Sequence, residues 1–182
     1  MASNDILYFH SKSKSAEGKH LSNFTLVDGG LTFANFEGKW DSEETGEKLK
    51  GKVFPSIEHA FQGVKFAMSG GSDAQIDALI KCLDIVQAKR MGGKKYFESN
   101  GMKLDIKKWS LYSKSFMRYL VRERIRSDDL YKTTVGKYLN RLYHFDRAGK
   151  RSIWGGYFSK ATGVWEGPNM LSKIMEEEYR KM

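Results

Sequence analysis

The sequence is poor in cysteine and proline, and it contains no long apolar segment. Cys82 is the only cysteine among 182 residues, so an intramolecular disulfide is excluded and a reducing compartment is expected. Its apolar surroundings in a predicted helix indicate a buried, inert thiol. No stretch approaches the roughly 18 apolar residues of a membrane-spanning helix, and the N-terminus has no secretory signal. We therefore expect an intracellular protein, cytoplasmic or nuclear, without a membrane partner.

Patterns that would hold a metal ion or a cofactor are missing as well. His10, His20 and His144 are isolated from other potential ligands, whereas metal sites need several ligands at defined spacings. The sequence contains neither a phosphate-binding loop nor a dinucleotide fingerprint. We expect no metal and no cofactor.

Acidic residues are scarce in one segment of the chain. The whole sequence has 31 Lys and Arg against 22 Asp and Glu, a net charge of +9. Residues 103–160 alone contain 15 basic and 5 acidic residues, a net charge of +10. Such a field favours a polyanionic partner, either nucleic acid or a phosphorylated substrate. A solvated basic face without a partner is the alternative, because no Lys/Arg run is long enough to form a nucleic-acid arm.

The N-terminal third of the chain reads as extended. Residues 6–9 are a strand candidate, and Asp28-Gly29-Gly30 is a turn signal between residues 24–27 and 31–36, which predicts a hairpin. Residues 39–52 are charged and contain glycine, and they read as a solvated loop or as an excursion of that hairpin. This region therefore predicts a small antiparallel hairpin or sheet.

Helical signals dominate from Ser56 onward. Apolar residues repeat every three to four positions, and Ser, Asp or Pro stands where each repeat begins. These signals predict helices over residues 56–68, 72–83, 84–92, 107–126, 127–142 and 168–179, with short strands or loops over 142–165. The expected fold is a helix-rich α+β single domain spanning residues 1–182.

The helix after Pro55 has the clearest pattern of reactive side chains. Glu58, Gln62 and Lys65 are spaced i, i+4 and i+7, so they share one helix face. The helix dipole keeps a carboxylate near the N-terminus ionised. A partly buried lysine loses its proton more easily and can act as a nucleophile. Spacing alone leaves open an ordinary surface stripe on an amphipathic helix.

The sequence around these residues resembles the NADAR (YbiA-like) family of N-glycosidases. The similar motifs occur in family order over about residues 21–175 and are individually short. They are Leu21-Ser22-Asn23-Phe24, the stretch Phe54-Pro55-Ser56-Ile57-Glu58-His59-Ala60-Phe61-Gln62-Gly63-Val64-Lys65-Phe66, Ala88-Lys89-Arg90-Met91-Gly92, Trp109 with Met117, Ile153-Trp154-Gly155, and Gly167-Pro168-Asn169-Met170-Leu171.

The resemblance implies hydrolysis of an N-glycosidic bond. One family branch destroys ribosylamino-pyrimidine intermediates of riboflavin synthesis, and another removes ADP-ribose from guanine in nucleic acid. By resemblance, Glu58 and Lys65 are the catalytic candidates and Asn169 supports the pocket. The ribose and base would be lined by Asn23, Gln62, Trp109 and Trp154.

The sequence departs from the family pattern before the Trp154-Gly155 pair. The family has a glutamate eight residues and an aspartate three residues before this pair, where this chain has Asp146 and Arg151. Asp146 keeps a carboxylate on a shorter arm, whereas Arg151 reverses the charge and suits phosphate binding. Either the second acid role has moved, or the substrate differs from that of the pyrimidine branch.

Further substrate-binding candidates have equally good structural explanations. His59 could orient a substrate or be a buried structural histidine. Lys89 and Arg90 could hold a phosphate or form a solvated helix end. Phe24 completes the first motif, and Gly155 places flexible backbone beside the Trp154 ring, which suits stacking.

The favoured function is removal of ADP-ribose from ADP-ribosylated guanine in nucleic acid. In this hypothesis Lys65 attacks the anomeric carbon, Glu58 is the acid/base and Asp146 assists. One alternative is hydrolysis of ribosylamino-pyrimidine intermediates. Another is a non-catalytic module that binds ADP-ribose or nucleic acid, because resemblance of fold does not prove chemistry.

Overall fold

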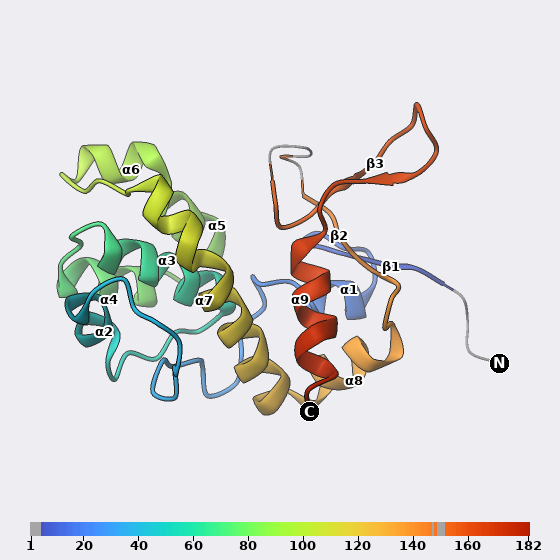
Figure 1. The fold of residues 1–182 in the computed structure, drawn as a ribbon, viewed down its shortest axis with the longest axis horizontal. Coiled ribbons are helices and arrows are strands. Elements are labelled where there is room, and N and C mark those ends of the chain that lie inside the picture. Colours follow the sequence, from blue (N-terminus) through green and yellow to red (C-terminus); the bar gives the residue numbers. More distant parts are fainter. Residues whose placement is uncertain (1–4, 147, 149–151) are drawn as a thin grey trace. The chain divides into compact units, whose positions relative to one another are not determined.

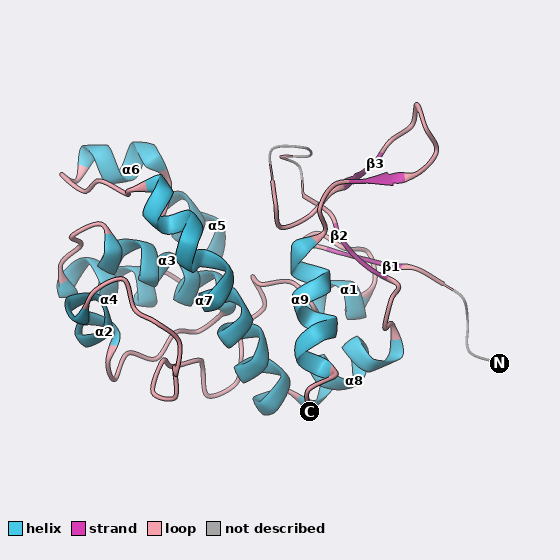
Figure 2. Ribbon diagram, in the orientation of Figure 1, coloured by secondary structure: helices cyan, strands magenta, loops and turns pink. Residues whose placement is uncertain are grey.

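The computed structural model describes residues 5–146, 148 and 152–182. Within these residues the protein is mostly helical with two small two-stranded sheets (Figures 1 and 2), so the helix-rich α+β class is confirmed. The chain forms two compact units. The middle unit consists of residues 26–120, and the terminal unit consists of residues 1–25 and 121–182. The single domain over residues 1–182 stays a prediction.

Helix α7 (Ile106–Ser127) passes from the middle unit into the terminal unit. It confirms the long helix predicted over residues 107–126. Among the described residues, no helix has the length and apolar composition needed to cross a membrane.

Helix α3 (Ile57–Met68) is the central element of the middle unit. It contacts α2 (Glu43–Leu49), α4 (Asp73–Lys81) and α5 (Ile85–Met91). All of its residues except Lys65 and Met68 are buried. A helix covered on nearly every side is typical of a core, so its polar side chains Glu58 and Gln62 lie inside the unit.

Capping side chains set the helix starts of the middle unit where the sequence predicts them. The Ser56 hydroxyl accepts the His59 N–H at 3.3 Å, Ser72 and Gln75 form a reciprocal capping box, and the Asp84 carboxylate accepts two N–H groups of α5. These contacts satisfy donors that the first helical turn cannot pair internally. The three predicted N-termini are confirmed. The short α6 (Lys94–Ser99) was not predicted.

An aromatic cluster forms much of the remaining core of the middle unit. The Phe33 ring lies 5.5–6.3 Å, centroid to centroid, from five other rings. These are the rings of Phe36, Trp40, Phe54, Phe116 and Tyr119. The cluster ties residues 33–40 to the buried side of α7, which explains how this irregular segment is held.

Three predictions for the middle unit are wrong. Residues 24–27 and 31–36 do not pair as a hairpin; the Gly30 N–H closes the expected turn on the Val27 carbonyl, but Leu31 bridges to Phe54 instead. Residues 39–52 contain helix α2, capped by Ser42. The reason is tertiary, because Leu49 is fully buried and anchors this otherwise charged helix. Cys82 is half-exposed beyond the end of α4 and is not a buried thiol.

The terminal unit is built around a parallel strand pair. Strand β1 (Leu7–Phe9) pairs with β2 (Leu142–His144), with Leu7 opposite Leu142. Strands β3 (Tyr157–Phe158) and β4 (Trp165–Glu166) form a separate antiparallel pair. The unit also contains α1 (Ala16–His20), α8 (Asp129–Lys137) and α9 (Met170–Tyr179), and α9 contacts both α8 and β2.

Two boundaries in the terminal unit differ from the predictions. Helix α8 ends at Lys137, not at about residue 142, because Asn140 adopts a left-handed conformation (φ 63°) and Leu142 begins β2. The predicted strand over residues 6–9 is confirmed, but its partner is β2, far along the chain. Pro168 lies before the N-cap residue Asn169, so it precedes α9 and is not in its first turn.

Candidate active site

Glu58, Gln62 and Lys65 come together on one face of α3, as their spacing predicts. The Gln62 Nε2 donates a hydrogen bond of 2.8 Å to Glu58 Oε1. Glu58 is only 7% exposed. The Lys65 Nζ donates to the Gly92 carbonyl at 3.2 Å. The helix therefore presents a carboxylate, a carboxamide and an ammonium in sequence along two turns.

Gly92, at the end of α5, is what allows the close approach of α5 to this face. A Cβ atom at Gly92 would collide with the Gln62 carboxamide. Glycine is therefore required here because it has no side chain to obstruct the packing. The backbone of Gly92 is not left-handed (φ -78°), so its conformation is not the reason. The sequence places Gly92 at the end of a predicted helix and in one of the family-like motifs, but its contact with Gln62 could be found only from the folded structure.

Trp109 forms an aromatic wall beside Lys65. The Lys65 Nζ lies 5.5 Å from the centroid of the Trp109 ring. The Phe61 ring meets the same indole edge to face at 4.8 Å. Such a ring attracts a cation electrostatically and excludes water from one side of it. The predicted placement of Trp109 near the reactive face is thus consistent with the structure.

The pKa of Lys65 is lowered from its ordinary value. Desolvation by burial is the largest cause, and the nearby Lys89 lowers the pKa further, whereas the Glu58 carboxylate raises it. Burial disfavours the charged ammonium because the protein solvates it less well than water does. A larger fraction of Lys65 is therefore neutral, and nucleophilic, at a given pH than for a lysine in water.

The Gln62 carboxamide has unused hydrogen-bonding capacity. Because its Nε2 donates to Glu58, its Oε1 points away from that carboxylate. Gln62 is 4% exposed, and Oε1 has no hydrogen-bond partner among the described residues. Buried acceptors are rarely left unsatisfied. Oε1 lies against Gly92, so a hydroxyl or N–H group of a ligand could donate to this acceptor only by reaching it past Gly92.

The three other candidates of the middle unit have different surroundings. His59 is fully buried, with Nδ1 2.8 Å from the Ser56 hydroxyl and Nε2 2.9 Å from the Cys82 carbonyl. Both ring nitrogens are thus engaged, which favours the structural alternative. Lys89 and Arg90 are exposed in the last turn of α5, and Lys89 acts on Lys65 through its charge.

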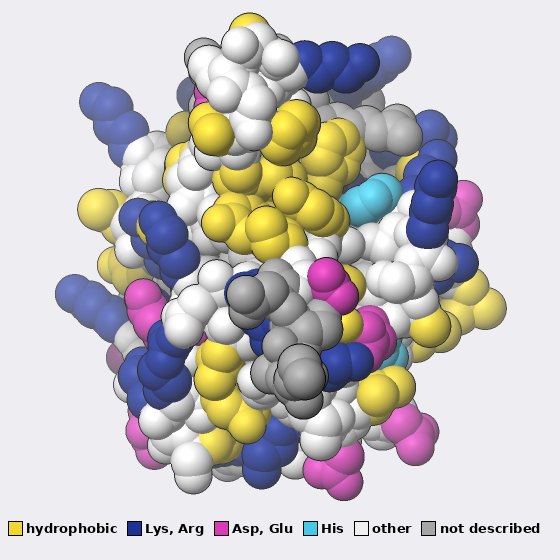
Figure 3. Space-filling view, turned by 90° about the vertical axis from the view of Figure 1, so that its right-hand side faces the viewer, with side chains coloured by type: hydrophobic (Ala, Val, Ile, Leu, Met, Phe, Trp, Pro, Cys, Tyr) yellow, Lys and Arg dark blue, Asp and Glu magenta, His cyan; other side chains and the backbone are white. Residues whose placement is uncertain are grey.

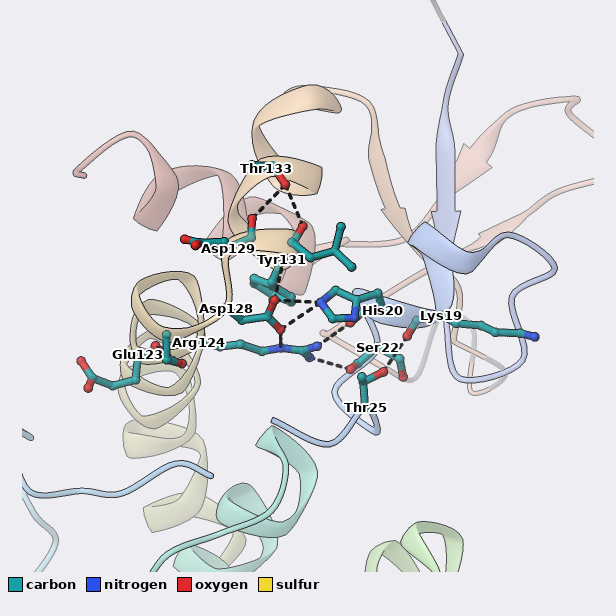
Figure 4. Close-up of polar contacts among 12 residues, drawn as sticks. Lys19, His20, Ser22, Thr25, Glu123, Arg124, Asp128, Asp129, Tyr131 and Thr133 are labelled. Atoms are coloured by element: carbon teal, nitrogen blue, oxygen red, sulfur yellow. Dashed lines mark hydrogen bonds and ion pairs between the residues drawn. The ribbon is translucent and has the colours of Figure 1, made fainter. Parts of the chain in front are cut away.

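In the terminal unit, a buried arginine holds the segment that contains Asn23 and Phe24 (Figure 4). Arg124 is fully buried near the end of α7. Its Nη1 donates to the Ser22 carbonyl at 2.9 Å and its Nη2 to the His20 carbonyl at 2.6 Å. A third hydrogen bond of 3.4 Å joins Nε to Asp128, and the guanidinium lies 4.2 Å from the centroid of the Tyr131 ring.

Asp128 completes this cluster on the other side. Its carboxylate lies 2.9 Å from His20 Nε2 and accepts the Tyr131 N–H at 2.8 Å. Desolvation by burial raises the pKa of Asp128. The Tyr131 N–H, His20 and Arg124 together outweigh that effect and lower the pKa overall. The carboxylate is therefore held ionised opposite Arg124.

The cluster explains why residues 22–24 adopt a defined turn. The Ser22 hydroxyl accepts the Phe24 N–H at 3.2 Å, and the Ser22 carbonyl accepts the Thr25 N–H at 3.0 Å in addition to Arg124. Asn23 and Phe24 are thereby held by a buried charge network. Sequence reasoning missed Arg124, since its only local signal is Asp128 four residues later.

Asn169 links strand β2 to the start of helix α9 in the terminal unit. Its Oδ1 accepts the His144 N–H at 2.9 Å and the Ser172 hydroxyl at 2.8 Å, while its Nδ2 donates to the Leu142 carbonyl at 2.9 Å. Its backbone is left-handed (φ 50°), a conformation that asparagine tolerates better than most residues. An asparagine at this position is thus explained by both its backbone and its side chain.

Asp146, Trp154 and Gly155 lie together beside β2. The Asp146 N–H donates to the Gly156 carbonyl at 3.0 Å, and a side chain at Gly155 would meet the Asp146 Cβ. The Trp154 carbonyl accepts the N–H of Leu171 in α9 at 3.0 Å. Trp154 and Asp146 are half-buried. Arg151 lies outside the described residues.

The predicted site residues therefore form two groups, one in each unit. Within the described part of the chain, no three His, Cys, Asp or Glu side chains are arranged to hold a metal ion. Comparison of the chain with protein-family models, curated proteins and solved structures gave no match.

Proposed function

We propose that this protein is an N-glycosidase that hydrolyses the bond between a ribose carbon and a base nitrogen. The observation that carries the proposal is the set of Glu58, Gln62 and Lys65 on α3. It combines a buried carboxylate, an acceptor that has no hydrogen-bond partner among the residues described by the structure, and a lysine whose pKa is lowered by burial. The motif resemblance described above adds the reaction class.

The three side chains suit the chemistry of this bond. Departure of the base leaves positive charge on the sugar, which a nearby carboxylate stabilises. In the proposed route, the neutral Lys65 amine bonds to the anomeric carbon. The base leaves with the electron pair of the glycosidic bond and takes a proton delivered through Glu58.

Water then releases the sugar from the lysine. After the ring opens, the lysine-bound sugar is a Schiff base, and Glu58 acts as the base that activates the attacking water. Hydrolysis restores the free amine and the aldehyde form of the sugar, so no redox change is involved. The supporting role of Asp146 stays a prediction.

We propose ADP-ribosylated guanine in nucleic acid as the substrate. The support is electrostatic, because residues 103–160 have 15 basic and 5 acidic residues and would attract a polyanion. Binding through phosphates weakens steeply as salt rises. Activity on a modified oligonucleotide should therefore fall with salt, whereas activity on a small ribosylamino-pyrimidine should change much less.

The test is release of ADP-ribose from an oligonucleotide that contains ADP-ribosylated guanine. Wild type, Lys65→Ala and Glu58→Gln are compared, each with and without borohydride, which reduces a Schiff base to a stable adduct. Lys94→Ala is the matched control, because that lysine side chain is 88% exposed. We expect turnover and a trapped adduct for wild type and Lys94→Ala, and a loss of at least about 10³-fold for Lys65→Ala.

Other outcomes separate the parts of the proposal. Turnover without a trapped adduct would support the N-glycosidase activity but would contradict attack by Lys65. The attacking group would then be water activated by Glu58. Turnover of ribosylamino-pyrimidines alone would contradict the proposed substrate, ADP-ribosylated guanine, and would assign the ribosylamino-pyrimidines in its place. Tight binding of ADP-ribose without turnover of either substrate would contradict the proposal that the protein is an enzyme, and would favour a binding module.

A further inference from the structure

The terminal unit contains a pocket formed by aromatic rings. Its volume is about 470 Å³, and it is lined by Tyr8, His10, Phe145, Phe158 and Trp165. Each of these residues has a planar ring, and none of them is among the residues predicted to bind substrate. They come from β1, β3, β4 and the residues that directly follow β1 and β2.

Strand alternation turns these rings toward solvent. Leu7 and Phe9 are buried, whereas Tyr8 between them is 42% exposed, as expected for successive side chains of a strand. Phe158 lies opposite Trp165 in the β3–β4 pair, so both rings are on the same face of that pair. Phe158 is 52% exposed. The pocket is therefore lined by rings that the core does not cover.

The rings contact one another at distances that hold their orientation. The Tyr8 and Trp165 centroids are 5.4 Å apart, and those of His10 and Phe145 are 5.3 Å apart. Tyr143 supports the Trp165 ring from the side at 5.0 Å. Rings positioned in this way lose little conformational freedom when a further ring stacks on them.

The charge near the pocket favours an anionic partner. The terminal unit has 16 Lys and Arg against 10 Asp and Glu, a net charge of +6. Lys12 and Lys160 are exposed and each lies two residues beyond a lining residue. The carboxylate of Glu166 is engaged by the Tyr157 and Thr162 hydroxyls. Figure 3 shows hydrophobic side chains gathered on this face with Lys and Arg side chains around them.

We propose that this aromatic pocket binds a base of single-stranded nucleic acid by stacking. Every base has flat aromatic faces, and exposed rings beside basic side chains are how proteins bind single strands without reading sequence. An aliphatic lining would be expected for a lipid chain or for the apolar face of a helix. In its link to catalysis the inference rests on the proposed function, since the strand would be the one that carries the ADP-ribose.

The test measures binding without any reaction. Fluorescence anisotropy of a labelled, unmodified single-stranded oligonucleotide is compared with that of an abasic oligonucleotide of equal length and charge. We expect the abasic strand to bind roughly tenfold or more weakly than the normal strand, and Phe158→Ala to weaken binding of the normal strand by a similar factor. Leu130→Ala is the control, because that side chain is exposed in α8, outside the pocket.

A second measurement covers the possibility that Phe158→Ala perturbs the fold. Bases stacked on an indole quench its fluorescence, so the oligonucleotide should quench wild-type emission, and Trp165→Phe should remove part of that quenching while keeping a ring in the wall. Equal affinity for normal and abasic strands, or quenching unchanged in Trp165→Phe, would contradict the proposal that this pocket binds a base by stacking. Both readouts use unmodified strands, so failure of the N-glycosidase proposal would leave them unchanged.

Discussion

Each unit of this protein buries a cation beside a carboxylate, and the two arrangements differ in how far their hydrogen bonds are satisfied. In the terminal unit, all three nitrogens of Arg124 donate hydrogen bonds, to Asp128 and to two backbone carbonyls. In the middle unit, Lys65 donates to the Gly92 carbonyl, and the neighbouring Gln62 Oε1 has no partner within the described residues. An ammonium has three donors and a carboxamide oxygen two acceptor sites.

The comparison separates a structural charge cluster from a candidate reactive one. Burial lowers the pKa of both cations, so a shifted pKa alone does not distinguish them. Arg124 stays protonated because a guanidinium cannot lose its proton under ordinary conditions. Lys65 can become neutral, and it lies beside hydrogen-bonding capacity that the fold does not use. The unused capacity supports the proposal that the middle-unit cluster is the one that binds and reacts.

The largest expected effect is a contrast in stability between the two cations. Arg124→Met leaves two backbone carbonyls and Asp128 without their buried partner, so we expect the free energy of unfolding to fall by about 3–5 kcal/mol. Lys65→Met should leave stability unchanged or raise it, because it removes a charge that burial disfavours. The cost of burying the ammonium is fully present at pH values below the lowered folded-state pKa of Lys65, and it disappears as the pH rises toward the unfolded-state pKa.

Urea unfolding followed by circular dichroism checks this contrast. Arg126→Met is the control for Arg124, since its side chain is 56% exposed and pairs with Glu123 on the surface. Exposed pairs contribute at most about 1 kcal/mol. Equal destabilisation by Arg124→Met and Lys65→Met would show that both clusters are structural and would remove the distinction drawn here.

A smaller effect on stability is expected from adding a methyl group at Gly92, where the backbone packs against Gln62. A methyl group at Gly92 would collide with the Gln62 carboxamide, so Gly92→Ala should cost about 1–3 kcal/mol of stability and should displace Lys65 from the Gly92 carbonyl. In a Gln62→Ala background the same change should cost much less, because the colliding group is gone. Equal costs in both backgrounds would mean that the contact does not hold this face in place.

The smallest expected effect concerns the ionisation of Lys65. Lys89 lowers the pKa of Lys65 through its charge, although desolvation by burial is the largest cause of the lowering, so Lys89→Gln should raise that pKa without restoring its ordinary value. Mass spectrometry measures the rate at which an amine-reactive acylating reagent modifies Lys65. This rate rises with pH as the ammonium loses its proton. In Lys89→Gln that rise should occur at higher pH, whereas the exposed control Lys94→Gln should match wild type.

The sequence predicted elements whose signals are local. Ser56, Ser72 and Asp84 cap helices because a side chain only two or three residues from the first N–H groups can accept their hydrogen bonds. The shared face of Glu58, Gln62 and Lys65 follows in the same way from the period of one helix. These predictions need no knowledge of distant segments, and the structure confirms them.

Predictions that depended on distant partners were less successful. Residues 31–36 have the pattern of a strand, but Leu31 bridges to Phe54 and the neighbouring rings enter an aromatic core. Strand β1 pairs with β2, which lies more than 130 residues further along the chain. An alternating apolar pattern can predict a strand, but it cannot predict which other strand it pairs with. Helix α2 forms in a charged stretch because Leu49 and Thr45 are buried against the rest of the unit.

By itself, the sequence determined the helix starts, the helix-rich α+β class and the shared face of Glu58, Gln62 and Lys65 on α3, because each depends on spacing within one segment. Tertiary structure decided that Gly92 meets Gln62, that Arg124 holds residues 20–22, and that five rings in or directly after the strands of the terminal unit form one pocket. Burial and hydrogen-bond satisfaction are properties of the folded chain. For that reason the difference between a structural cation and a candidate nucleophile is visible only in three dimensions.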